Sequence, residues 1–372
     1  MSEKRQTGKK APARSNKKKR ASRAVGRGVL RFLLLTLETV LLVALAVYAA
    51  MFVLAKGPSP TARDRLVMSL HETSALKWMP NLVLSEEEIA EIESTRATNI
   101  EYQETDTSLI TINTPQSADP SGGPAEDPWG LIDEDGDGIV IDRVRGEGYN
   151  GYMMVVYDAS RVIMGCVPSS FEKQGYVLAD MVKQFDAVAG INAGGFLDPG
   201  GWGNGATPDS MVVYKGTVYY SRYGLSQYNC FVGFDDEYKM HVGQLSSEDI
   251  EAKHIQYGVC FGPALVLNGK AVDPSGFASG NNPRTAIGQR SDGAVLMLVI
   301  DGRQATSLGA SLQDLSDIML SYGAMNACNL DGGSSSLLWY DGAYLNNKAH
   351  IVGIREIPTS FLVLKEGVRS DG

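Results

Sequence analysis

The sequence predicts an α+β fold: a mixed, hairpin-rich β-sheet domain with a few helices, preceded by a single N-terminal transmembrane helix. Three observations predict it. A long apolar run, residues 29–55, follows a basic head. From Gly138 onward, short runs of β-branched and aromatic residues are separated by Gly, Asp and Asn, as in strands joined by turns. A few segments with helical spacing interrupt these runs, without the regular βαβ alternation of a parallel sheet.

The N-terminal part predicts a membrane signal-anchor. From Phe32 to Ala55 the only charged residue is Glu38, and about 20 apolar residues span a bilayer core. The run exceeds the roughly 7–15 apolar residues of a cleaved signal peptide, although "YAA" near Ala50 leaves a processed form open. Residues 1–28 hold eleven Lys or Arg against one Glu, which favours a cytoplasmic tail. We expect a single-pass protein of the cell membrane, with its N-terminus cytoplasmic and residues 56–372 outside.

The charge of the chain argues against nucleic acid as a partner. The formal net charge is −9, although residues 1–28 are strongly basic, so the remainder is more acidic than the total. Nucleic-acid binding depends on Lys and Arg that neutralise phosphates. We therefore expect no nucleic-acid partner for the folded part, and contact with the membrane through residues 29–55.

Residues 56–135 predict an extracytoplasmic juxtamembrane region and linker. "SEEEIAEIESTR", Ser85–Arg96, has an N-cap serine and an acidic first turn, which favours a short helix. "NTPQSADPSGGPAEDP", Asn113–Pro128, is rich in Pro, Gly, Ser and Asp and is typical of a linker. The folded domain is expected over residues 136–372.

Within that domain, three segments have apolar residues at helical spacing: Val177–Val188, Ser311–Tyr322 and, more weakly, Ser247–Ile255. "VYKGTVYY" and "LVLNGKAV" are typical of hairpins. The other predicted strands are "GIVIDRVRG", "YMMVVYD", "RVIMGCV", "AVLMLVIDG", "AMNACNL", "SLLWYDGAYL" and "SFLVLKEG".

The cysteines and one acidic turn have two interpretations each. Four cysteines lie in apolar surroundings without metal-like spacing, which favours buried thiols, although export would permit disulfides. In "DEDGDGIVID", Asp133, Asp135 and Asp137 fit the first positions of a calcium loop. Position 12 is Val144 instead of the bidentate glutamate, and the segment leads into a strand. We therefore favour an acidic turn over a calcium site, and we expect no metal and no cofactor.

Polar residues at strand ends are the candidates for chemistry. Asp301 and Arg303 follow the apolar run "LMLVI", Arg284 begins another run, and Asp331 ends "AMNACNL" before two glycines. Each could also be a turn or surface residue. "NLDGGSSS" is no phosphate-binding P-loop, because it lacks the lysine and the following helix. It is no nucleophile elbow either, because GxSxG is absent. None of the four histidines lies beside a Ser/Gly loop, which disfavours a Ser–His triad.

Two glycine-rich stretches could approach a ligand or simply connect elements. "INAGGF", Ile191–Phe196, places Asn192 beside Gly194 and Gly195, where a backbone can turn or lie close to a substrate. "DPGGWGNGATP" follows it and could cover a site as a mobile loop.

The order "INAGGF", "FGPALVLNG", "NPRTAIGQ", "VIDGRQ", "SLQDLSDIML" and "NLDGGSSS" resembles the phosphodiester glycosidase family over residues 140–365. The resemblance implies hydrolysis of a sugar–phosphate bond at the glycosidic carbon, in a sugar phosphodiester of the GlcNAc-1-phosphodiester type. Bacterial members are often membrane-anchored or exported, with exopolysaccharide or cell-envelope roles. Ser334 departs from the family, in which many members have a third glycine there.

The resemblance also implies roles for residues. A sugar leaving a phosphodiester passes through an oxocarbenium-like state that carboxylates stabilise, while Arg stabilises the departing phosphate. The catalytic set is then Arg284 and Arg303 on the phosphate, with Asp301 and Asp331 for acid/base work or oxocarbenium stabilisation. The substrate-binding set is Asn192, Gly194, Gly195, Thr285, Gly332, Gly333 and Ser334.

Two other functions remain open from the sequence. One is a metal-dependent phosphodiesterase that cuts the P–O bond with Asp301 and Asp331 as ligands. The other is a non-catalytic module for glycan binding or exopolysaccharide assembly.

Overall fold

The computed structural model describes residues 14–71, 78–94, 103–113, 126–197, 204–220, 230–273, 280–347 and 353–369. Most of the predicted linker, Asn113–Pro128, and residues 198–203 of the predicted mobile loop lie outside these ranges. The chain divides into two compact units, residues 1–63 and 64–372.

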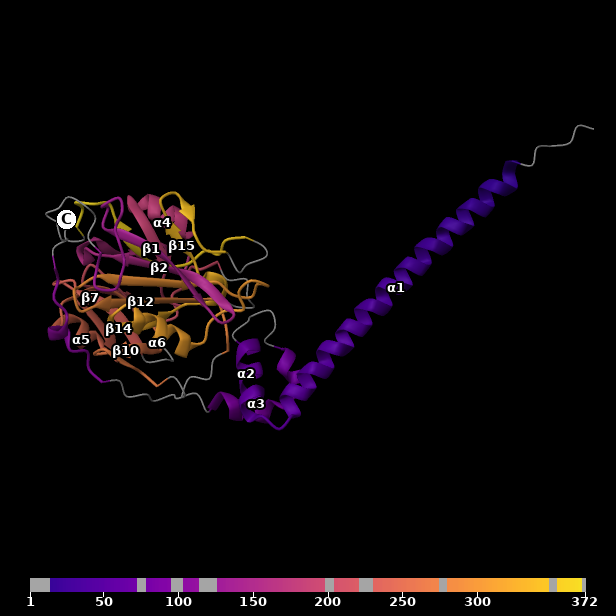
Figure 1. The fold of residues 1–372 in the computed structure, drawn as a ribbon, viewed down its shortest axis with the longest axis horizontal. Helices are drawn as coiled ribbons and strands as arrows, with labels where there is room; N and C mark the ends of the chain where they lie inside the picture. Colours follow the sequence, from indigo (N-terminus) through magenta and orange to yellow (C-terminus); the bar gives the residue numbers. More distant parts are fainter. Residues whose placement is uncertain are drawn as a thin grey trace, which may run out of the picture. The chain divides into compact units, whose positions relative to one another are not determined.

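The first unit consists mainly of helix α1, Arg14–Lys56. Its part Gly28–Lys56 is long and apolar enough to cross a membrane (Figure 1). The sequence-based prediction of an apolar N-terminal helix is confirmed. α1 ends where Gly57 and Pro58 follow, and helix α2, Pro60–His71, begins with Ser59 capping the backbone N–H of Ala62 at 3.3 Å.

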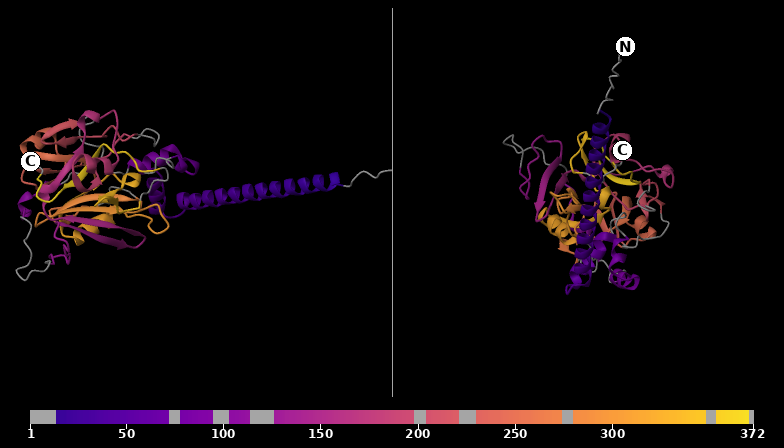
Figure 2. Two further views of the ribbon diagram at one scale, coloured as in Figure 1. Left: turned by 90° about the horizontal axis from the view of Figure 1, so that it is seen from above. Right: turned by 90° about the vertical axis from the view of Figure 1, so that its right-hand side faces the viewer.

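The second unit contains three sheets, and every strand pair in them is antiparallel (Figure 2). Sheet I has the order β1 Ile139–Gly146, β2 Tyr149–Val156, β13 Val295–Ile300, β12 Arg284–Arg290, β14 Ala324–Leu330, β10 Ala264–Leu267, β11 Lys270–Ala271. Sheet II has the order β16 Ala343–Tyr344, β15 Leu338–Tyr340, β4 Ala187–Asn192, β17 Thr359–Leu364, β3 Val162–Cys166. Sheet III has the order β6 Thr217–Tyr220, β5 Val212–Tyr214, β9 Ile255–Phe261, β7 Cys230–Asp235, β8 Met240–Gly243. The predicted α+β, hairpin-rich fold is confirmed.

The largest core cluster joins buried residues from all three sheets and from helix α4, Leu178–Gln184. The other face of sheet I packs against helix α6, Leu312–Ser321, which lies beside β10 and β14 (Figure 1). A smaller cluster joins sheet III to helix α5, Ser247–Ala252. Helix α3, Glu86–Ser94, occupies most of the predicted segment Ser85–Arg96.

The structure confirms one predicted helix of this domain almost unchanged and shortens two. α6 begins after Ser311, which forms the capping box with Asp314. The prediction Val177–Val188 was too long, because Asp186 adopts φ +51° and Val188 belongs to β4. α5 ends at Ala252, and the predicted end Ile255 is the first residue of β9.

Residues 104–113, here called the strap, pack along the sheets of the second unit, although they fall in the region 56–135 that was predicted to be a juxtamembrane region and linker. The Thr105 hydroxyl donates to the Val242 carbonyl at 2.6 Å and accepts from the Val242 N–H at 2.9 Å. Asp106 N–H donates to Asn268 Oδ1 at 2.8 Å. Thr111 N–H donates to the carbonyl of Ser291 at 2.8 Å, in the β12–β13 turn. The strap therefore crosses sheets III and I as an ordered part of the domain.

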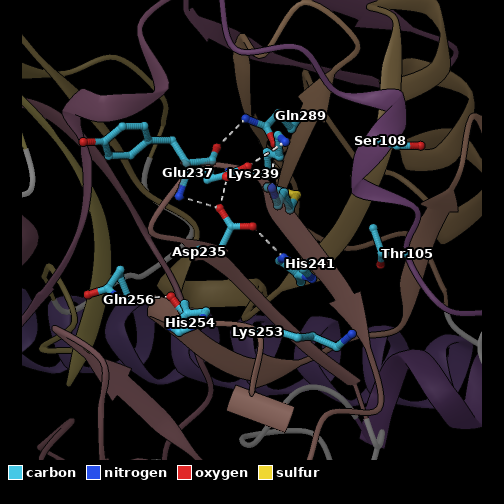
Figure 3. Close-up of polar contacts among 12 residues, drawn as sticks. Thr105, Ser108, Asp235, Glu237, Lys239, His241, Lys253, His254, Gln256 and Gln289 are labelled. Atoms are coloured by element: carbon cyan, nitrogen blue, oxygen red, sulfur yellow. Dashed lines mark hydrogen bonds and ion pairs between the residues drawn. The ribbon is translucent and has the colours of Figure 1, made fainter. Parts of the chain in front are cut away.

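The β7–β8 hairpin is tied to sheet I by buried polar groups (Figure 3). Asp235 accepts from the N–H groups of Glu237 and Lys239, and His241 Nε2 lies 2.8 Å from its second oxygen. Gln289 of β12 accepts from the Met240 N–H at 2.7 Å. His241 thus has a carboxylate partner within the β7–β8 hairpin.

The acidic turn leads directly into β1, as the sequence predicts. Asp133, Asp135 and Asp137 bring one carboxylate oxygen each within 4.8 Å of the others. Asp133 accepts from the N–H groups of Gly136 and Gly138 at 3.0 and 2.9 Å, and Tyr340 donates to Asp137. Burial and the neighbouring acids raise the pKa of Asp133. These contacts are those of a hydrogen-bonded acidic turn.

All four cysteines are buried free thiols, which confirms the prediction. The sulfurs of Cys230 and Cys328 lie 3.6 Å apart in the core between β7 and β14. Burial raises the pKa of Cys166 to about 12.

Candidate functional site

Two strands of sheet I deliver acidic residues to one edge. β12 runs antiparallel to both β13 and β14, with Arg284 opposite Ile300 and Thr285 opposite Leu330. β13 and β14 therefore run in the same direction, so Asp301 and Asp331 follow their last residues at the same edge. Because β12 lies between them, β13 and β14 are two strand spacings, or about 10 Å, apart. The strand-end positions predicted for these two residues agree with the structure.

Asn192, the last residue of β4, joins sheet II to this edge. Its Nδ2 donates to the backbone carbonyl of Asp331 at 2.6 Å. Its Oδ1 accepts from the Thr285 hydroxyl at 2.8 Å and from the Leu337 N–H at 3.1 Å. Asp331 N–H in turn donates to the Ala193 carbonyl at 3.0 Å. Asn192 is 1% exposed, so it acts by fixing the backbone beside Asp331.

Gly195 leaves room for a carboxyl group. A Cβ atom at this position would lie 2.5 Å from Asp209 Oδ2 and 2.9 Å from the Phe261 ring. Asp209 N–H donates to the Gly195 carbonyl at 3.1 Å, and the neighbouring Gly194 N–H donates to the Thr359 hydroxyl at 3.1 Å. The Asp209 side chain therefore lies directly against the backbone of "INAGGF", which only glycine permits.

Asp209 shares this space with Asp331, and the sequence did not single it out. Burial, followed by the charge of Asp331, raises the pKa of Asp209 to about 7. The Asp331 side chain is half-buried. A buried carboxyl group whose pKa is raised beside a second carboxylate is suited to acid/base chemistry. "ATPDS" has no pattern that distinguishes it from a loop, so only the tertiary contact with Gly195 and Asp331 identifies Asp209.

Arg303 lies over the glycine turn after Asp331. Gly333 adopts φ +62°, and a Cβ atom there would lie 3.4 Å from Arg303 Nη1. Arg303 is exposed and donates from Nη2 to Asn282 Oδ1 at 3.1 Å. A Cβ atom at Gly332 would lie 2.9 Å from the Pro283 carbonyl. Gly332 is needed for this close packing and Gly333 for its positive φ, and the turn that they form lies beside the Arg303 guanidinium.

A second guanidinium group at this loop belongs to Arg355, another residue that the sequence did not single out. Its Nη1 donates to the Ser334 hydroxyl at 3.1 Å, and its guanidinium carbon lies 4.7 Å from the centre of the Phe196 ring. Ser334 stands where many members of the family have a third glycine, and its hydroxyl accepts a hydrogen bond from Arg355. The buried hydroxyl oxygens of Ser335 and Ser336 have no hydrogen-bond partner within the described ranges.

Asp301 and Arg284 make mainly structural contacts. Asp301 is 2% exposed and accepts from the backbone N–H and the Nδ2 of Asn347, at 2.9 and 3.2 Å. Its pKa is raised by burial and lowered less by these hydrogen bonds. Arg284 donates from Nη2 to the Gly280 carbonyl at 2.9 Å and from Nε to the Ala310 carbonyl at 3.3 Å. Their predicted chemical roles stay predictions, while the observed contacts fix the loops around the edge.

Most of the predicted set thus lies at one place. Asn192, Thr285 and Asp331 are joined by hydrogen bonds, and Gly194, Gly195, Gly332, Gly333, Ser334 and Arg303 surround them through the contacts given above. Asp301 lies at the same sheet edge but contacts the loop at Asn347.

The antiparallel strands of sheet I thus bring acidic residues and arginines to one edge. Residues 185–364 match the model of the phosphodiester glycosidase family, and the resemblance predicted from the sequence is confirmed. The matched residues include Asp209, Asp301 and Asp331, together with Arg284, Arg303 and Arg355.

Two similar proteins carry the comparison further. The chain is 32% identical over 175 residues to the SPbeta prophage-derived uncharacterized protein YomE of Bacillus subtilis (strain 168), a match covering 45% of this chain and 26% of YomE. The chain thus spans about a quarter of that relative. The catalytic domain of zebrafish N-acetylglucosamine-1-phosphodiester alpha-N-acetylglucosaminidase, described as auto-inhibited by its pro-peptide, has a similar fold, with a TM-score of 0.51 and 18% identity. That alignment covers 61% of this chain and 82% of the zebrafish domain.

Proposed function

We propose that this protein is a membrane-anchored, extracytoplasmic glycosidase that hydrolyses the sugar–phosphate bond of a sugar phosphodiester, of the GlcNAc-1-phosphodiester type. The single observation that carries the proposal is the buried Asp209 carboxyl, which lies against the Gly195 backbone and has its pKa raised by burial and by the charge of Asp331. The family match of residues 185–364 supports the reaction type.

The two carboxyl groups have different tasks in this reaction. The Asp331 carboxylate stabilises the positive charge that develops at the sugar ring or directs the attacking nucleophile. Asp209, whose pKa of about 7 keeps it largely protonated below neutral pH, donates its proton to the departing phosphate oxygen. If both were ionised, three negative groups would meet, because the phosphodiester is itself an anion. Water adds at the glycosidic carbon, the C–O bond breaks, and a proton from water restores Asp209.

The guanidinium groups bind the phosphate. Arg303 lies over Gly333, and Arg355 reaches the same loop through Ser334. A planar guanidinium can donate two hydrogen bonds to phosphate oxygens. Arg284 supports the site indirectly in this scheme, because its side chain orders the backbone at Gly280 and Ala310.

Asp301 is a positioning residue in this scheme. It holds Asn347, and the adjacent Asn346 donates to the Ser336 carbonyl at 2.9 Å and accepts from the Leu338 N–H at 2.8 Å. Asp301 thereby supports the segment that follows the Asp331 turn.

The topology suggests where the substrate is found. A cytoplasmic basic tail and the apolar part of α1 would hold residues 56–372 at the outer membrane–water boundary. We therefore propose cell-envelope or exopolysaccharide material, such as phosphodiester-linked glycan, as the substrate class.

The decisive experiment is to incubate the detergent-solubilised chain with a GlcNAc-1-phosphodiester in ¹⁸O water. Label in the released sugar supports glycosidic C–O cleavage. Label in the phosphate, together with loss of activity on adding EDTA, would instead support a metal-dependent phosphodiesterase. Binding of the glycan without turnover would support a non-catalytic module. Lys215→Gln, at an exposed turn of sheet III, serves as a control variant that should retain full activity.

A further inference from the structure

A polar hollow lies outside the candidate site. Its volume is about 390 Å³. The side chains that matter for its chemistry come from the β1–β2 hairpin and from the loop after β13: Arg143, Arg145, Tyr149, Asn150, Tyr152 and Thr306. No aspartate or glutamate lines it.

The strand register places both arginines on one face. Arg143 lies opposite Tyr152 and Arg145 lies opposite Asn150 in the antiparallel pair β1–β2. Directly opposed residues, and residues two apart on one strand, share a face of the sheet. The Arg143 guanidinium lies 5.6 Å from the centre of the Tyr152 ring, which orients it beside the hollow.

Both guanidinium groups are available for a ligand. Arg143 and Arg145 are exposed, and across the described ranges neither forms an ion pair with a carboxylate. Asp142, their neighbour on β1, turns to the other face, where Tyr322 bonds to it. Two unpaired arginines in a hollow without acids are unusual in the acidic part of this chain, and they form a local positive region.

Hydrogen bonds link residues of the hollow to the edge that carries the candidate site. The Asn150 carbonyl accepts from the Asp301 N–H at 2.8 Å, and Asn150 Nδ2 donates to the Thr306 carbonyl at 2.9 Å. The Ser307 hydroxyl donates to the Asp301 carbonyl at 2.6 Å. In sheet I, β1 is separated from β14 by β2, β13 and β12. Four strand spacings put β1, which carries Arg143 and Arg145, about 19 Å from β14, the strand that delivers Asp331.

We propose that this hollow is a remote subsite that binds a phosphate group of a polymeric phosphodiester. The inference rests on the proposed function, because a polymer with regularly spaced phosphates would reach the hollow while one of its sugar–phosphate bonds lies at Asp331. Arg143 and Arg145 supply charge-assisted hydrogen bonds to phosphate oxygens, and Asn150 and Thr306 supply neutral polar contacts. The site therefore selects polymers over short phosphodiesters.

The test measures binding and turnover of two probes by the detergent-solubilised full chain. One probe is a fluorescent hexamer of glycerol phosphate, and the other is a single GlcNAc-1-phosphoglycerol unit. The double variant Arg143→Gln/Arg145→Gln is compared with Lys215→Gln/Lys270→Gln, which removes the same charge from exposed positions in sheet III and on the opposite edge strand of sheet I. Thermal unfolding midpoints of both double variants establish that they fold.

We expect the arginine variant to bind the hexamer about tenfold more weakly, as loss of one or two charge-assisted contacts implies, with a shallower salt dependence. The lysine variant should bind it within twofold of wild type. An unchanged hexamer affinity in the folded arginine variant overturns the subsite. If inorganic phosphate competes with the hexamer at equal phosphate concentration, the hollow binds single phosphate ions, and the proposed preference for a polymer is wrong.

The two proposals fail separately. If wild type cleaves the single unit but the arginine variant binds the hexamer normally, only the subsite is wrong. If wild type cleaves no sugar phosphodiester while the arginine variant loses hexamer binding, the proposed function is wrong and the hollow remains an anion-binding site.

Discussion

The substitution Asp209→Asn tests the carboxyl pair through the stability of the protein. The amide keeps the shape of the side chain but cannot ionise. In the wild type, burial and the charge of Asp331 raise the pKa of Asp209 from 3.8 to about 7. A carboxyl with a raised pKa in the folded state stabilises the protein fully below the unfolded pKa, and this contribution is lost as pH rises through the folded pKa.

The magnitude follows from the size of the shift. A change of about three pKa units corresponds to up to about 4 kcal/mol, at 1.36 kcal/mol per unit. Wild type should therefore lose up to about 4 kcal/mol of unfolding free energy from this group between pH 4 and pH 8. The Asn variant lacks this term, whereas all other titrating groups affect both proteins alike. Between pH 4 and pH 8, the unfolding free energy of the variant should therefore rise relative to that of wild type by up to about 4 kcal/mol.

The assay is urea unfolding of the detergent-solubilised chain at several pH values, followed by tryptophan fluorescence. If the difference in unfolding free energy between variant and wild type stays constant to about 0.5 kcal/mol from pH 4 to pH 8, the raised pKa of Asp209 is refuted. In the Asp331→Asn background the dependence on Asp209 should shrink without vanishing, because burial is the larger cause of the shift. The same titration should give kcat/KM an alkaline limb near pH 7 that Asp209→Asn removes.

Three further predictions concern the same domain. Asp331→Asn should lower kcat on a sugar phosphodiester at least about 100-fold, measured at saturating substrate with the folded state checked by thermal unfolding; retained turnover would exclude this carboxylate from the reaction. Asn192→Ala removes three buried hydrogen bonds and should cost about 2–4 kcal/mol of unfolding free energy, whereas a change below about 0.5 kcal/mol in urea titration would contradict its role in joining the sheets. The four cysteines should resist a thiol-specific chromogenic reagent in the native protein and all react in denaturant; fewer than four reactive thiols would indicate a disulfide.

The sequence predicts those elements whose local pattern and tertiary environment agree. α6 has both an apolar stripe and the Ser311–Asp314 capping box, so its limits are readable to within one residue. β4 was hidden, because Ala187 and Val188 continue the apolar spacing of α4, and only the positive φ of Asp186 separates the two. β7, β8 and β9 were also not predicted; their glycine-containing runs show little alternation because they are buried on both faces.

The site residues likewise divide into those that a local sequence pattern marks and those that only tertiary contacts identify. Asp331 could be proposed because it ends an apolar run and precedes two glycines. Asp209 and Arg355 could not, because their positions depend on contacts with Gly195 and Ser334 that are distant along the chain. Arg284 shows the opposite case, in which a residue prominent in the sequence uses two of its donors on backbone carbonyls.

The strap has a consequence for proteolytic processing. Its residues are held to Val242, Asn268 and the β12–β13 turn by hydrogen bonds and by the burial of Ile110. A single cut between residues 113 and 126 would break the covalent chain but not these contacts. The two fragments would migrate together under native conditions and separate only in denaturant. Such a cut would therefore not shed the domain, and release from an N-terminal anchor would require cleavage before residue 104.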